Sequence, residues 1–132
     1  MGLDMYAWKT KSEDLRQENE NDVDLANWRK HNRLHGFMQM LWEEQGCPNP
    51  NGDTPETFNC VPVELDEIDL NRLQKYIKEK NLPDTQGFFF GHNSYDYDTE
   101  EVKEQDAYDL LFVKNGLQAI KDGYKVVYVS WW

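Results

Sequence analysis

The sequence predicts an α+β fold, in which a small antiparallel sheet built from strands near the two ends of the chain packs against about three helices. Residues 3–9 show partial alternation and are rich in aromatic and apolar side chains, which favours a strand. Residues 124–132 are rich in β-branched and aromatic residues, which favours a second strand. Between them, three segments carry apolar residues at helical spacing. The length of 132 residues fits one domain, covering residues 1–132.

The first predicted helix covers residues 25–44, and Asp24 is its expected N-cap because an Asp side chain accepts hydrogen bonds from first-turn amides. Two stripes at three- and four-residue steps predict the buried face. They consist of Trp28, His31, His35, Met38 and Trp42, and of Leu34, Phe37 and Leu41. Arg29 and Arg33 are expected to point away from this face. The polar residues 10–23 are expected to form a loop or a short helical turn.

The second predicted helix covers residues 66–80 and follows a short extended piece at residues 61–65. Asp66 is its expected N-cap, and Asp69 three residues later completes an imperfect capping box. Pro83 marks the end of the helix, because the residue before a proline disfavours helical backbone. The side chains expected to be buried are Ile68, Leu70, Leu73, Tyr76 and Ile77.

The third predicted helix covers residues 99–121, and Asp122-Gly123 is expected to turn the chain into the last strand. Gly116 lies inside this helix and weakens it by about 1 kcal/mol relative to Ala. The side chains expected to be buried are Val102, Leu110, Val113, Leu117 and Ile120.

Two segments are predicted to be loops. Residues 46–60 contain three prolines and two glycines, and residues 92–99 are polar and acidic. Cys47 and Cys60 lie at the two ends of the first loop. Two reduced thiols are the first interpretation, and a disulfide that staples the loop is the alternative. Without a second cysteine pair, a zinc knuckle is not expected.

The charge of the chain limits its partners. It has 14 Lys and Arg against 25 Asp and Glu, which gives a net charge of −11, and 14% of its residues are aromatic. The aromatic content favours a folded domain with an acidic surface over disorder. The net charge argues against binding a nucleic-acid backbone and against docking on anionic membranes. The acids cluster in three blocks, and two basic islands at residues 29–33 and 72–80 lie between them.

The sequence also bears on location. No apolar run approaches the roughly 18 residues that a membrane span needs. Residues 1–6 show no basic region followed by an apolar stretch, so they do not resemble a signal peptide. A cytoplasmic location is therefore expected, in the host cytoplasm if a phage carries the gene.

Several segments in order along the chain carry a family resemblance. They are Met1 to Tyr6 (MGLDMY), Asn27 to Asn32 (NWRKHN) with His35, Leu82 to Gly91 (LPDTQGFFFG), Tyr95-Asp96, and Tyr128 to Trp132 (YVSWW). Together they resemble a family of small proteins found in phages and bacteria. The family has no assigned activity to carry over. Some members are described as phosphoglycerate kinases, but that enzyme is a far larger two-domain protein, and no Gly-rich phosphate loop precedes a helix here.

One cluster of residues is a candidate ligand site. Arg29 can hold a carboxylate or phosphate through two hydrogen bonds, and His35 can act as an acid, a base or a ligand near neutral pH. An anionic metabolite or a nucleotide is the ligand class that these residues fit. The candidate residues are Trp28, Arg29, Lys30, Asn32 and His35, with Asp4, Tyr128 and Ser130 brought alongside by the sheet. In the alternative interpretation, Trp28 and His35 belong to the core and the basic residues pair with surface acids.

No metal, cofactor or catalytic motif is predicted. His31 and His35 have the i, i+4 spacing of a helical metal pair, but residue 32 is Asn where a metalloprotease helix has Glu. The acidic segments at 49–53 and 96–101 lack a complete calcium loop and are expected to be solvated. No serine lies in a nucleophile elbow, and neither cysteine lies in a redox motif.

The surplus of aromatic residues favours binding to a protein. The candidate partner-binding residues are Phe88, Phe89 and Phe90, between two glycines, and Trp131 and Trp132 at the end of the sequence. The first functional hypothesis is a small acidic accessory protein of phage type that binds a host or viral protein. The second is a binder or enzyme for a small anionic ligand. The third is a structural or self-associating protein that uses its terminal tryptophans.

Overall fold

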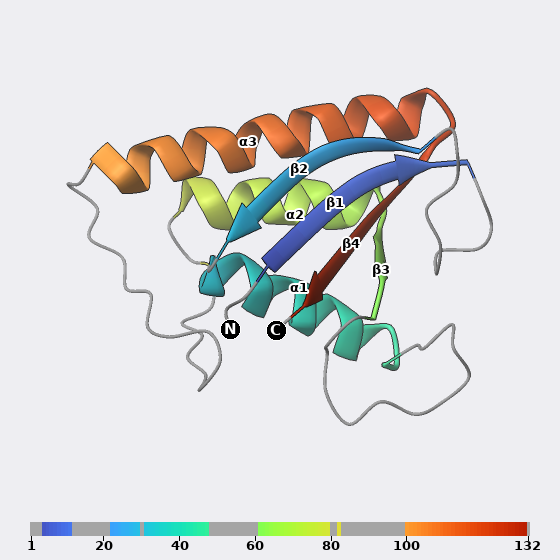
Figure 1. Ribbon diagram of the computed structural model, residues 1–132, viewed down its shortest axis with the longest axis horizontal. Coiled ribbons are helices and arrows are strands. Elements are labelled where there is room, and N and C mark those ends of the chain that lie inside the picture. Colours follow the sequence, from blue (N-terminus) through green and yellow to red (C-terminus); the bar gives the residue numbers. More distant parts are fainter. Residues whose placement is uncertain are drawn as a thin grey trace.

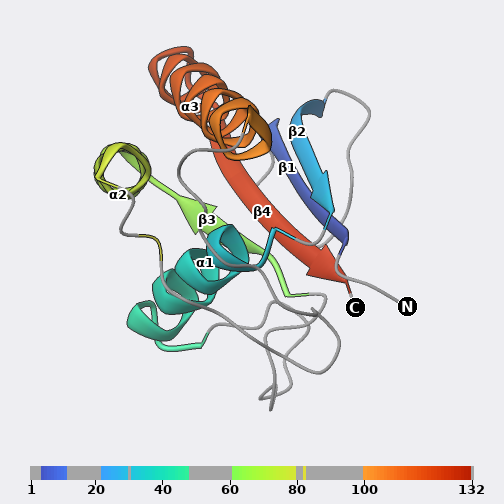
Figure 2. The ribbon, with the colours of Figure 1, turned by 90° about the vertical axis from the view of Figure 1, so that its left-hand side faces the viewer.

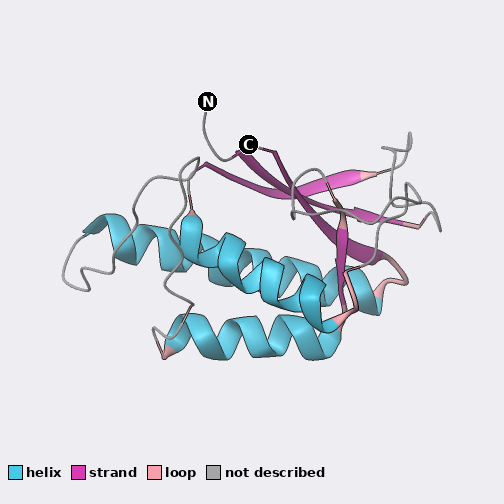
Figure 3. Cartoon of the chain, turned by 90° about the horizontal axis from the view of Figure 1, so that it is seen from below, coloured by secondary structure: helices cyan, strands magenta, loops and turns pink. Residues whose placement is uncertain are grey.

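The computed structural model describes residues 4–11, 22–29, 31–47, 61–79, 82 and 100–131. Within these residues the element order is β1 (Asp4–Thr10), β2 (Val23–Arg29), α1 (Asn32–Glu44), β3 (Val63–Leu65), α2 (Glu67–Lys78), α3 (Glu100–Lys121) and β4 (Lys125–Trp131). The strands form one antiparallel sheet in the order β2-β1-β4-β3 (Figure 1). All three helices lie on one face of this sheet (Figures 2 and 3). The α+β fold predicted from the sequence is confirmed.

The two strands from the chain ends are the central pair of the sheet. β1 pairs with β4 from Asp4 opposite Trp131 to Thr10 opposite Lys125, so the predicted antiparallel pairing is confirmed. Side chains alternate between the two faces of a strand. Met5, Ala7 and Tyr128 are fully or almost fully buried against the helices. The residues that alternate with these three along β1 and β4 therefore lie on the face away from the helices.

The prediction that the first helix includes residues 25–29 is wrong. Residues 23–29 form the edge strand β2, in which Ala26 and Trp28 are buried while Asn27 and Arg29 are exposed. Pairing with β1 supplies the backbone of this segment with hydrogen bonds that a helix would otherwise provide. A register shift opposite Ala7 and Trp8 gives β2 one extra residue. Asp24 is consequently an exposed strand residue and not an N-cap.

His31 is the N-cap of α1, and its Nδ1 accepts from the Leu34 amide at 3.5 Å. The buried face follows the predicted stripes from this point on. Leu34, Phe37, Leu41, His35, Met38 and Trp42 are all buried. Arg33 departs from the prediction, because only 8% of its surface is exposed and its Nη1 donates to the Leu82 carbonyl at 3.4 Å. The aliphatic part of an arginine side chain can be buried in this way while its guanidinium donates a hydrogen bond to a carbonyl.

The start of α2 confirms the predicted capping box in full. The Asp69 amide donates to Asp66 Oδ1 at 2.8 Å, and the Asp66 amide donates to Asp69 Oδ2 at 3.1 Å. Leu70, Leu73 and Ile77 are buried as expected, and Tyr76 packs edge-on against Phe37 in the core. The expectation for Ile68 is wrong: 74% of its surface is exposed, because the first turn of α2 presents this position to solvent.

The third helix, α3, agrees with its predicted range to within one residue at its start. Val113 is buried, whereas Leu110, Leu117 and Ile120 are partly buried and pack against the core. A methyl group on Gly116 would lie 3.0 Å from Leu70 Cδ1, so this glycine permits the close approach of α2. The Asp122-Gly123 turn is also observed, and Gly123 has a φ of +90°.

Several predictions fall outside the described residues: the loop at 48–60 with Cys60, the aromatic run Phe88 to Phe90, the acidic loop at 92–99, and Trp132. Cys47 carries a free thiol. Among the described residues, no helix combines the length and the apolarity that crossing a membrane requires.

Candidate functional site

A cleft of about 370 Å³ opens to solvent where the end of β2 meets the first half of α3. It is lined on one side by Asn27, Trp28, Arg29 and His31, and on the other by Glu104, Gln105 and Tyr108. The two walls therefore come from segments about 75 residues apart in the sequence, which the sheet and α3 bring together. A cleft of this size is within the range of small-molecule sites.

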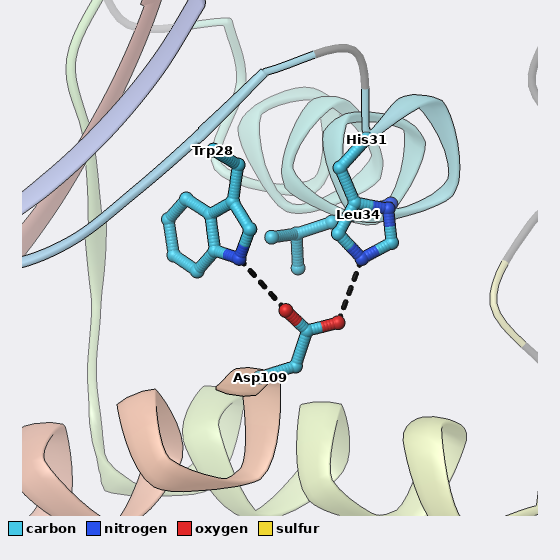
Figure 4. A network of polar contacts seen from close by, with 4 residues as sticks. All are labelled: Trp28, His31, Leu34 and Asp109. Carbon is cyan, nitrogen blue, oxygen red and sulfur yellow. Dashed lines mark hydrogen bonds and ion pairs between the residues drawn. The ribbon is translucent and has the colours of Figure 1, made fainter. Parts of the chain in front are cut away.

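A buried aspartate joins the two walls beneath the cleft. Asp109 of α3 is 0% exposed, and its carboxylate accepts a hydrogen bond of 2.7 Å from Trp28 Nε1 (Figure 4). Its other oxygen lies 2.7 Å from His31 Nε2. Because His31 Nδ1 accepts from the Leu34 amide, Nε2 carries the proton that points at Asp109. Both nitrogens of His31 are thus engaged within the protein.

Tyr108 forms the aromatic rim of the cleft and ties α3 to the edge strand. Its hydroxyl accepts from the Asn27 amide at 3.0 Å. Its ring meets the Trp28 indole edge-on, with centroids 5.9 Å apart and planes at 88°. Phe112, one turn further along α3, meets the same indole edge-on at 5.1 Å. This packing holds the floor of the cleft in place, while 40% of Tyr108 remains exposed.

The cleft carries charges of both signs. The Arg29 side chain is 75% exposed and lies 3.9 Å from Asp4 Oδ1 on the neighbouring strand. Glu104 faces the same cleft from α3, beside the amide of Gln105. The site therefore offers a guanidinium donor on one wall and a carboxylate acceptor on the other.

The predicted ligand cluster is only partly brought together. Trp28 and Arg29 line the cleft, and Asp4 contacts Arg29. Lys30 and the side chain of Asn32 fall outside the described residues. The remaining three candidates, His35, Tyr128 and Ser130, lie in the core at 0%, 0% and 1% exposure, so they do not line the cleft. The sheet places Tyr128 and Ser130 on the helix-covered face, opposite to the face of Asp4.

His35 and Tyr128 form a second buried polar pair. His35 Nδ1 shares a hydrogen bond of 2.8 Å with the Tyr128 hydroxyl. Burial lowers the pKa of His35 to about 4, so its imidazole is neutral at neutral pH. Burial also raises the pKa of the Tyr128 phenol well above its usual range, an effect that the neighbouring Ser130 hydroxyl partly opposes. A metal pair of His31 and His35 is not formed, and no group of three metal-ligating side chains occurs in the described residues.

The sequence analysis did not identify Asp109, Tyr108, Glu104, Gln105 or Asn27. The sequence did contain a signal for Asp109, because Asp109 lies four residues before Val113 on the predicted buried stripe of the third helix. A carboxylate at such a position needs buried donors, since an unpaired charge in the core is costly. The identity of those donors was not visible in the sequence.

Two aromatic side chains are exposed on the face of the sheet that lies away from the three described helices. Trp131 is 63% exposed and Tyr6 is 46% exposed, on the adjacent strands β4 and β1. Trp131 lies opposite Asp4, which lies opposite Arg29, so these three form one row across the sheet. We call Tyr6, Trp131 and Arg29 the aromatic patch. Of the partner-binding residues predicted from the sequence, Trp131 belongs to this patch, and the other four fall outside the described residues.

Comparison with known protein families, with curated proteins and with solved structures finds no match to this chain.

Proposed function

We propose that this chain acts by binding a partner protein through the aromatic patch. The observation that supports the proposal is the exposure of Tyr6 and Trp131 on adjacent strands of the same sheet face. Trp, Tyr and Arg are the residues most enriched among those that dominate binding energy in interfaces. Exposed aromatic groups of this size on neighbouring strands are therefore better explained by a partner than by stability of the chain itself.

The spacing of the two aromatic rings suits contact with one side chain of a partner protein. Tyr6 lies opposite Val129, and Trp131 lies two residues further along the same strand. Diagonal neighbours of this kind are about 7 Å apart, close enough for one partner side chain to contact both rings. Arg29 adds a charged donor at the edge of the patch.

The state of the histidines favours binding over catalysis. Both histidines within the described residues are almost fully buried, at 1% for His31 and 0% for His35, and both have partners inside the fold. Neither presents a free imidazole to a substrate in solution. The net charge of −11 suits a partner with basic groups around its contact surface. The resemblance to small phage and bacterial proteins supports a host or viral protein as that partner, in the host cytoplasm.

The test compares patch variants with a matched control in capture of the partner from lysate of infected and uninfected source cells. Trp131→Ala and Tyr6→Ala are expected to reduce the captured partner at least tenfold, because each removes a central aromatic contact. Leu111→Ala is the control, since Leu111 is 52% exposed but lies on α3. Equal capture by all three variants contradicts the proposal.

A second measurement separates a foreign partner from a second copy of the chain. The mass in solution is measured across a range of concentrations for the full chain and for Trp131→Ala. A concentration-dependent dimer that Trp131→Ala abolishes would favour the self-associating protein instead. A monomer at all concentrations, together with loss of capture, supports a foreign partner.

A further inference from the structure

We propose that the cleft between β2 and α3 binds a small zwitterion: a molecule with a carboxylate, an ammonium group and an apolar or aromatic body, as in a free α-amino acid. This site shares Arg29 with the aromatic patch of the proposed function, but its other wall is formed by Glu104, Gln105 and Tyr108 of α3 and does not include Tyr6 or Trp131. Its volume of about 370 Å³ falls within the range of small-molecule sites.

The charges on the two walls of the cleft favour a ligand that carries both a positive and a negative charge. Arg29 favours a carboxylate, which its guanidinium can hold through two hydrogen bonds. Glu104 faces the same cleft, and Asp4 lies 3.9 Å from Arg29. A ligand with only negative charge would meet two carboxylates in a chain of net charge −11, and a ligand with only positive charge would meet Arg29. A zwitterion satisfies Arg29 and Glu104 together.

The uncharged lining gives the ligand an apolar wall and further hydrogen bonds. The edge-on rings of Trp28 and Tyr108 form an apolar corner against which a flat or branched side chain can pack. The Tyr108 oxygen accepts from the Asn27 amide, and its own proton can still be donated to a ligand. Gln105 adds an amide that can both donate and accept.

The floor of the cleft is held rigid before any ligand arrives. Asp109 fixes Trp28 and His31 through two contacts of 2.7 Å, and all three residues are buried. A wall fixed in advance lowers the entropy cost of binding a small molecule. The buried aspartate therefore acts as a positioning residue for the site.

The experiment titrates the full chain with matched probes and follows the backbone amide resonances of Gln105 and Tyr108. The probes are L-phenylalanine, its N-acetyl derivative without the ammonium, its amide without the carboxylate, and inorganic phosphate. L-phenylalanine is expected to bind at least tenfold more tightly than each of the others, the effect of losing one hydrogen bond to a charged group. Equal binding of the N-acetyl derivative, tighter binding of phosphate, or no shift with any probe at millimolar concentration overturns the proposal.

Two variants test which charged group of the ligand each wall of the cleft binds. Arg29→Gln is expected to weaken L-phenylalanine at least tenfold and to leave the amide probe unchanged, whereas Glu104→Gln weakens L-phenylalanine and leaves the N-acetyl probe unchanged. Glu79→Gln is the control. Glu79 is an exposed acid at the end of α2, so this substitution removes the same charge at a place away from the cleft. Loss of affinity with Glu79→Gln as large as with Glu104→Gln contradicts a local site. Trp131→Ala is expected to keep amino-acid binding, so failure of the partner proposal and failure of this one are distinguishable.

Discussion

His31 and His35 lie one turn apart at the start of α1 and are equally buried, but they have different partners. His31 contacts the carboxylate of Asp109 and joins α3, β2 and α1 beneath an open cleft. His35 contacts the hydroxyl of Tyr128 deep between α1 and β4. A buried carboxylate requires several donors to offset the lost hydration of its charge, whereas a phenol and a neutral imidazole carry no charge and lose less hydration on burial. Burial alone therefore does not define the role of a histidine.

The largest expected effect tests the buried carboxylate of Asp109. Asp109→Ala removes the acceptor for Trp28 Nε1 and His31 Nε2, which leaves two buried N–H groups without a partner. Leaving one buried donor without a partner costs about 1–3 kcal/mol, so for the two donors together we expect the free energy of unfolding measured in urea to fall by about 2–6 kcal/mol. Asp109→Asn retains one carbonyl acceptor and is expected to lose less.

Asp122→Ala is the control for that measurement. Asp122 follows the end of α3 and is exposed, where it accepts from Gln118 Nε2 at 3.2 Å. Its replacement is expected to change the free energy of unfolding by no more than about 0.5 kcal/mol. An equally small change for Asp109→Ala would mean that the buried network contributes nothing to stability.

The second effect tests the neutral pair through pH. The pKa of His35 is about 4 in the folded chain against 6.5 in the reference state, so the unfolded chain binds one more proton between these values. The free energy of unfolding is therefore expected to fall as pH decreases from 6.5 to 4, by about 1.4 kcal/mol per unit and about 3 kcal/mol in all. Above pH 6.5 this contribution is constant. Urea unfolding at a series of pH values measures it.

His35→Gln serves as the comparison, because it removes this titration and leaves the other groups in place. The difference in free energy of unfolding between the original chain and the variant is expected to shrink as pH falls from 7 to 4. A difference that stays constant over this range would show that His35 does not titrate below its usual pKa.

The third effect compares the loss of a neutral partner with the loss of a charged one. Tyr128→Phe keeps the ring in the core and removes only the hydroxyl 2.8 Å from His35 Nδ1. We expect the free energy of unfolding to fall by about 1–2 kcal/mol, less than for Asp109→Ala, because one hydrogen bond is lost and not two. Thermal unfolding of the two variants under the same conditions gives the comparison. A loss for Tyr128→Phe that equals that for Asp109→Ala would remove the distinction between the two histidines.

The smallest effect lies at the rim of the cleft. Tyr108→Phe removes the acceptor for the Asn27 amide, which lies on an exposed edge strand where water can replace the hydroxyl. We expect a loss of about 0.5–1 kcal/mol in the free energy of unfolding and faster hydrogen exchange at the Asn27 amide. Unchanged exchange at this amide would contradict a role for Tyr108 in fastening α3 to β2.

Part of the site was predictable from the sequence. Trp28 and Arg29 were candidates from their residue types, and both line the cleft. His35 was also a candidate from its residue type. Its placement on the same helix face as Trp28, seven residues earlier, depended on one continuous helix. Because residues 23–29 form a strand, that spacing no longer places the two side chains on one face. The burial of His35 agrees with its place on the predicted buried stripe, but it keeps His35 out of the cleft.

Local patterns were sufficient for the elements whose ends carry their own signals. Three local signals each specify structure over a few residues: the capping box of Asp66 and Asp69, the apolar stripe from Leu34 onward, and the aromatic and apolar residues at 3–9. Each depends on contacts between neighbours in the sequence, so each could be recognised without knowledge of the rest of the chain.

The sequence by itself determined the α+β class, the pairing of the terminal strands and the start of α2. Only the tertiary structure decided that residues 23–29 join the sheet edge, because β1 has to be available for them to pair with. It also decided the site, since Asp109 meets Trp28 and His31 across 81 and 78 residues of sequence. No local rule predicts which buried donors reach a given carboxylate, because that depends on how the helix packs on the sheet.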